Sequence, residues 1–269
     1  MRVSASRRRA GPVVVVLASI GLALLVLPLV GLVLRAPWAE LPALLRSEPV
    51  LQALGLSLAT AAVSTVACLV FGIPLAVLLA QSVHWPVVAR RLLRAAITIP
   101  LVLPPVVGGI ALLLLLGRRG IVGQWLAEVG ITLPFTTGAV VLAQTFVAMP
   151  FLVFAVEGAL RSSDRRSEAA AATLGATAGQ TFRLVTLPLV APGIAAGTVL
   201  CFTRALGEFG ATITFAGSFP GVTRTLPIAS YLAMNSDPDT AIALALVLLA
   251  VSAIVLLTLR DRWLPGVVR

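Results

Sequence analysis

The sequence predicts an all-α membrane protein with six transmembrane helices and both chain termini in the cytoplasm. Hydrophobic residues make up 59% of the chain and charged residues only 11%, a balance that soluble domains rarely show. The hydrophobic residues gather in runs of about 20, the length of helix that crosses a hydrocarbon layer. Strands of membrane β-barrels are much shorter, and every backbone group in lipid must be paired, so we expect these runs to be helices.

Six runs of the chain have this character. The predicted spans cover roughly residues 12–34, 53–80, 95–116, 135–157, 191–215 and 239–259. The first follows three arginines and resembles a signal peptide, but its apolar run is too long and no small-x-small cleavage site follows it, so we interpret it as a retained anchor. We therefore expect an N-terminal anchor helix and first outer loop at 1–52, a transmembrane domain at 53–257 and a short cytoplasmic tail at 258–269.

The third predicted span begins irregularly, with Pro104, Pro105, Gly108 and Gly109 close together. Proline and glycine weaken a helix, and a break at membrane depth is tolerated where the backbone lines a cavity or where neighbouring helices satisfy it. These four residues are therefore candidates for a gate. The alternative is a kinked helix that serves packing only.

The positions of the arginines orient the spans. One set of alternating segments carries Arg2, Arg7, Arg8, Arg9, Arg90, Arg91, Arg94, Arg161, Arg165, Arg166, Arg183, Arg260, Arg262 and Arg269; the other carries Arg35, Arg46, Arg118, Arg119 and Arg224. Because the arginine-rich side of a membrane protein is usually cytoplasmic, both termini are expected inside.

The composition also excludes several kinds of chemistry. The chain has no lysine and a single histidine, His84, to which we assign no function. A Walker A phosphate loop needs lysine, a zinc-protease motif needs two histidines, and one histidine makes a Ser-His-Asp triad improbable. We expect no catalytic residue, no metal site and no cofactor bound by this chain. The net charge of +10 reflects the loop arginines and favours membrane orientation over binding of nucleic acid.

Residues 168–188 read EAAAATLGATAGQTFRLVTLP and fall in a predicted cytoplasmic loop. The alanine run favours a helix, and Gly175 fits the left-handed residue that ends one. Thr177 and Gln180 have capping-box spacing, which predicts a second short helix. We expect Pro188 to end that helix, because proline interrupts helical hydrogen bonding.

The order of residues in this loop resembles the EAA loop of ABC importer permeases, which docks on a cytosolic ATPase. Gly175 is followed by nine residues, then an aliphatic Val185, one further residue, and Leu187 with Pro188. Glu168 stands seven residues before Gly175, whereas the general motif has glutamate at six. This shifted form is similar to the molybdate branch of the family.

Two further segments carry the same resemblance. The run CFTRALGEFGATITFAGSFPGVTRTLP at 201–227 and the run LPPVVGGIALL at 103–113 are both similar to molybdate permeases. With the loop, the resemblance covers roughly residues 53–257. It implies the type I ABC importer permease fold, in the cell membrane of a bacterium.

The resemblance also implies partners and a substrate. Two copies would form a pathway for an oxyanion, molybdate or tungstate, with cytosolic ABC ATPases that hold ATP and magnesium and with an extracytoplasmic molybdate-binding protein. The coupling loop would lie at about 161–190, where the residues expected to serve docking are Glu168, Ala169, Ala170, Gly175, Phe182, Leu187 and Pro188. Since Glu168 is displaced, we expect the Gly175 turn to matter more than the carboxylate. The alternatives are a permease for sulfate or thiosulfate and, more distantly, a stand-alone secondary transporter or channel.

Two opposite charges lie inside the fifth predicted span. Arg204 and Glu208 are four residues apart, so one face of a helix would carry both and they can pair. Charges at this depth are costly and should face protein or water, which makes them either pathway residues or a structural pair. The hydroxyls of Thr203, Thr212 and Thr214 line the same path or bond back to their own helix.

Overall fold

The computed structural model describes residues 11–163 and 165–263, and all regular structure within them is helical. The helices are α1 Pro12–Leu34, α2 Leu41–Leu45, α3 Glu48–Gln81, the 3-10 turn η1 Ser82–His84, α4 Val87–Val102, α5 Pro105–Leu116, α6 Gly123–Glu128, α7 Thr137–Ser162, α8 Arg165–Thr173, α9 Ala178–Thr181, the π turn η2 Phe182–Thr186, α10 Leu187–Leu206, α11 Gly210–Ala216, α12 Leu226–Ala233 and α13 Pro238–Trp263. Five helical segments are long and apolar enough to cross a membrane, or six if α4 and α5 form one bent span. The predicted all-α membrane architecture is confirmed.

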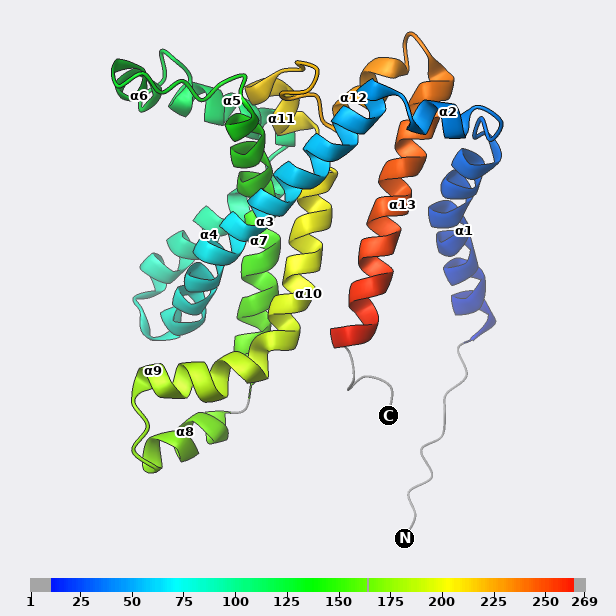
Figure 1. Cartoon of the computed structure of the whole chain (residues 1–269). Helices are drawn as coiled ribbons and strands as arrows, with labels where there is room; N and C mark the ends of the chain where they lie inside the picture. Colours follow the sequence, from blue (N-terminus) through cyan, green and yellow to red (C-terminus); the bar gives the residue numbers. More distant parts are fainter. Residues whose placement is uncertain (1–10, 164, 264–269) are drawn as a thin grey trace.

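The long helices stand roughly side by side, with short helices at both ends (Figure 1). α2, α6, α11 and α12 lie at one end, whereas α8 and α9 project from the other, where α1 begins and α13 ends. α1 packs beside α13 and has no buried residue, as expected for a helix whose apolar side chains face lipid.

The bundle core is formed by α3, α7 and α10, which pack through small residues. A Cβ atom on Gly193 of α10 would lie 2.3 Å from the Cβ of Ala159 on α7, and one on Gly197 would lie 2.9 Å from the Cβ of Ala155. Small residues let membrane helices approach until their backbones nearly touch. Cys68 and Cys201, both free and fully buried, lie in the same core.

The third span, predicted at 95–116 with an irregular start, consists of two helices. α4 and α5 meet at 115°, with the break at Leu103 and Pro104. Leu103 is extended, at φ −66° and ψ 133°, because the ring of a following proline disfavours the helical region. The two adjacent prolines therefore turn the chain rather than merely kink it.

The fifth span was predicted wrongly at both ends. At its far end α10 stops at Leu206, and residues 207–209 separate it from α11. At its near end Pro188 does not end the second loop helix, because α9, η2 and α10 run together as one helical segment, Ala178–Leu206. The π turn ends at Thr186, two residues before Pro188, and its wider hydrogen-bonding pattern accommodates a residue that has no N–H.

The close approach of α7 and α10 leads to a first prediction. Gly193→Ala should force these backbones apart and lower the stability of the purified protein by about 1–3 kcal/mol, read as a lower melting temperature in detergent. Gly55→Ala is the matched control, since a Cβ there meets nothing within 4 Å. Equal melting temperatures for the two variants would contradict the tight packing.

Candidate functional site

The loop between α8 and α9 is a well-formed turn. Gly175 has φ +83°, and its N–H donates to the carbonyl oxygen of Ala172 at 3.0 Å, while the N–H of Ala176 donates to that of Ala171 at 3.1 Å. These two bonds define a Schellman motif, in which the left-handed position favours glycine. The expected role of Gly175 in ending the first helix is confirmed.

The second helix begins as the spacing indicated. Thr177 Oγ1 accepts from the N–H of Gln180 at 3.3 Å, and the Gln180 side chain accepts from the N–H of Thr177 at 2.8 Å. This reciprocal capping box satisfies two donors that a helix start would leave unpaired. The turn between α8 and α9 is thus fixed on both sides of Gly175.

Sequence reasoning missed Leu174, a large apolar residue in this turn. Leu174 is 87% exposed and stands next to Gly175. Burial of a leucine side chain is worth roughly 2 kcal/mol, and this residue forgoes that stabilisation in the free subunit. The signal was an apolar residue at the end of an otherwise alanine-rich helix.

Of the residues predicted for the loop, most face outward and one faces inward. Exposed residues are Ala169, Ala170, Gly175, Phe182, Leu187 and Pro188. The Glu168 carboxylate instead accepts from the hydroxyl of buried Thr186 on η2 at 2.8 Å. A cavity of about 550 Å³, lined by Glu168, Phe182 and His84 among others, lies between this Glu168–Thr186 contact and the end of α3. Glu168 therefore holds α8 against the base of α10.

The break between α10 and α11 is held by the predicted ion pair. Arg204 Nη1 lies 2.6 Å from Glu208 Oε2, and Glu208 Oε1 accepts from the N–H of Ala211 at 2.8 Å. The Glu208 side chain is 1% exposed, whereas that of Arg204 is 27% exposed. The arginine thus stands at the negative end of the α10 dipole and the carboxylate at the positive end of α11, which stabilises both helix ends.

The three threonines predicted for the pathway differ in their hydrogen bonding. Thr203 Oγ1 donates to the carbonyl oxygen of Val199 at 2.9 Å, and Thr214 Oγ1 donates to that of Gly210 at 2.8 Å. Both therefore bond back within their own helix, the alternative left open from the sequence. Thr212 is fully buried, and its hydroxyl has no hydrogen-bond partner among the described residues.

The structure brings the candidate gate and the ion pair together. A Cβ on Gly109 of α5 would lie 2.8 Å from both the carbonyl oxygen of Ala211 and the Cβ of Thr214, and one on Gly210 would lie 3.0 Å from Pro105 Cβ. Gly108 turns instead towards the ring of Phe146 on α7. Exposed Pro104 forms the bend itself. The two broken helices therefore meet directly at their breaks, backbone against backbone.

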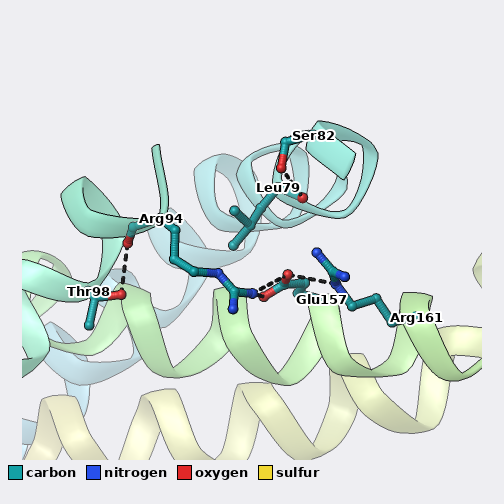
Figure 2. Close-up of polar contacts among 6 residues, drawn as sticks. All are labelled: Leu79, Ser82, Arg94, Thr98, Glu157 and Arg161. Carbon is teal, nitrogen blue, oxygen red and sulfur yellow. Dashed lines mark hydrogen bonds and ion pairs between the residues drawn. The ribbon is translucent and has the colours of Figure 1, made fainter. Parts of the chain in front are cut away.

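A second charged cluster lies at the end of the bundle nearer α8. Arg94 Nη2 contacts both oxygens of Glu157, at 2.6 and 2.8 Å, and Arg161 Nε contacts one at 2.8 Å. Figure 2 shows the two arginines approaching the carboxylate from opposite sides, beneath the turn that carries Leu79 and Ser82. The sequence contained only part of the signal: Glu157 and Arg161 have helical spacing, but Arg94 is distant in the chain.

Comparison with known proteins identifies the family. Residues 72–266 match the family described as binding-protein-dependent transport system inner membrane component. The chain belongs to this family. The permease is therefore a non-catalytic inner membrane subunit that crosses the membrane several times, in a family without bound cofactors. The family's transport systems imply a binding protein and an ATPase as partners.

Individual relatives agree with this assignment. The molybdenum transport system permease protein ModB of Mycobacterium tuberculosis is 52% identical over 237 residues, which cover 88% of this chain and 89% of the relative. The protein of the same name from Escherichia coli K12 is 41% identical over 224 residues, 83% of this chain and 96% of that one. A bacterial alginate ABC transporter shares the fold, with a TM-score of 0.72, 19% identity and coverage of 94% and 95%.

The buried pair at the second break leads to a prediction. Arg204→Ala leaves the Glu208 carboxylate buried without its partner, which should destabilise the permease by about 3–5 kcal/mol. The double variant R204M/E208Q should recover most of the lost stability. It removes both charges, and the side-chain amide oxygen introduced by E208Q can still accept from the N–H of Ala211. Melting temperatures in detergent measure both effects. An unchanged melting temperature in R204A would contradict the stabilising role of the pair.

Proposed function

We propose that this permease is the membrane subunit of an ATP-driven importer for molybdate, with tungstate as a closely similar oxyanion. The observation that carries the proposal is its 52% and 41% identity, over most of its length, with permeases named for molybdenum transport. The run at 201–227 that resembles molybdate permeases includes Arg204, Glu208 and the break between α10 and α11. The segment that marks the substrate class is thus also the segment that forms the second break.

We further propose the orientation and the assembly. Arg90, Arg91, Arg94 and Arg161 gather at the α8–α9 end of the bundle, which supports a cytoplasmic position for that end and for both termini. The outer end would then receive the binding protein. Two copies would enclose the pathway, and each would present its α8–α9 loop to one ATPase.

Coupling would proceed through the continuous helical segment Ala178–Leu206. Its 29 residues bend where α9 and η2 pass into α10 (Figure 1), and they join the Gly175 loop to the break at 207–209. Exposed Leu174 would enter the ATPase surface, and Glu168 would keep α8 fixed to the base of the same segment. ATPase closure would then move loop and helix together as one rigid body.

At the far end, the Arg204 guanidinium would supply positive charge to the oxyanion. Its partly exposed side chain keeps donors available, while Glu208 fixes its position from within the protein. Because Gly109 and Gly210 leave no space between α5 and α11, movement of the second break would carry the first with it. The two breaks would thus act as one gate for the anion.

The coupling role of the loop is tested at its turn. Gly175→Val places a β-branched residue at φ +83°, a strained backbone conformation, and should lower molybdate uptake per ATP hydrolysed several-fold without preventing membrane insertion. Gly175→Asn should retain more coupling, because asparagine adopts this conformation more readily. Gly179→Val is the matched control, since a Cβ there meets nothing and its φ is not positive. Wild-type coupling in G175V would refute the docking role.

The substrate is tested with the complete complex. In proteoliposomes that contain the permease, its ATPase and its binding protein, we expect molybdate to stimulate ATP hydrolysis and sulfate to compete poorly. Stimulation by sulfate or thiosulfate in place of molybdate would assign the permease to the alternative substrate class. Flux through the permease alone, driven by an anion gradient without ATP, would instead indicate a secondary transporter or a channel.

A further inference from the structure

A pocket lined by arginines lies beside the Glu157 cluster. It encloses about 280 Å³ between the start of α4 and the end of α7, and its lining residues are Ser82, Arg90, Arg91, Arg94 and Arg161. The Ser82 hydroxyl already donates to the carbonyl oxygen of Leu79 at 2.7 Å. The hydrogen-bond donors that a ligand would meet are therefore guanidinium groups.

The pocket carries an excess of positive charge. Arg94 and Arg161 share the single carboxylate of Glu157. Neither Arg90 nor Arg91 has an ion pair with any carboxylate in the part of the chain that the structure describes. Figure 2 shows Arg161 contacting the carboxylate through Nε, with a terminal nitrogen directed towards the turn that carries Leu79 and Ser82. Four guanidinium groups against one carboxylate repel one another unless an anion enters.

The surroundings of the pocket resemble a membrane surface. Next to the arginines on α4, Val88 is 69% exposed and Leu92 is 65% exposed. A helix with arginines on one side and exposed apolar residues on the other lies at the boundary between lipid tails and headgroups. Guanidinium groups there meet phosphate oxygens, for which their planar donors give paired hydrogen bonds.

We propose that this arginine pocket is a binding site for a phosphate-class oxyanion, held by Arg90 and Arg91 with help from Arg161. The headgroup phosphate of an anionic phospholipid is the source that its depth favours, and a free oxyanion is the other. The bound anion would join the start of α4 to the end of α7, and so fix the segment that leads into the first helix break. The site is separate from the proposed transport pathway and does not depend on which anion is imported.

The test removes the two unpaired arginines from the full complex. R90Q/R91Q leaves the Arg94–Glu157–Arg161 contacts intact and should weaken binding of phosphatidylglycerol about tenfold to thirtyfold, measured as retained lipid by native mass spectrometry. R118Q/R119Q removes an adjacent arginine pair from the opposite end and should retain lipid like the wild type. R90K/R91K keeps the charges that orient the membrane spans, and should lose binding only in part.

A second arm separates the two sources. Inorganic phosphate is titrated into delipidated complex, and its binding is compared between wild type and R90Q/R91Q. Loss of lipid binding with little phosphate binding in either protein assigns the site to the lipid headgroup, whereas loss of phosphate binding alone assigns it to a free oxyanion. Equal lipid retention and equal phosphate binding in wild type and R90Q/R91Q would overturn the proposal, as would equal losses in R118Q/R119Q.

Discussion

The architecture depends on the contact between two broken helices. A break within a membrane leaves backbone groups without helical partners, and each unpaired group in lipid is costly. Here each break covers the other: Gly109 lies against the backbone of Ala211, and Gly210 against Pro105. The Glu208 carboxylate supplies an acceptor at the start of α11, and Arg204 neutralises its charge. The buried ion pair therefore stabilises the interruption between α10 and α11 inside the membrane.

The same chain also contains a helix that continues where a break was expected. Pro188 follows a π turn, so the loop helix and α10 remain one segment. Proline therefore has two roles in this protein: the pair at Pro104 and Pro105 interrupts the helix, whereas Pro188 lies within a helical segment that bends but stays continuous. The difference is set by the preceding residues, since Leu103 becomes extended while the turn before Pro188 widens and stays helical.

Local features could be predicted from the sequence because they depend on near neighbours. The left-handed Gly175, the capping box at Thr177 and the pairing of Arg204 with Glu208 each follow from spacing along the chain. Long-range contacts could not be predicted, because hydropathy does not show which faces meet. The approach of Arg94 to Glu157 and the meeting of the two breaks are of this kind.

The continuous segment Ala178–Leu206 has a geometric consequence for the size of any motion. Within that segment α10, which runs through the bundle, is a rod of 20 residues, about 30 Å long, and a tilt of about 5° around its base moves its far tip by roughly 3 Å. At Gly109 and Gly210 the helices α5 and α11 leave no room for a Cβ atom, so this contact cannot absorb such a displacement in place. A tilt too small to disturb the packing near the loop is therefore large enough to separate or slide the contact at the far end. The displacement at the far tip grows with the length of the helix and does not depend on the strength of any single bond along it.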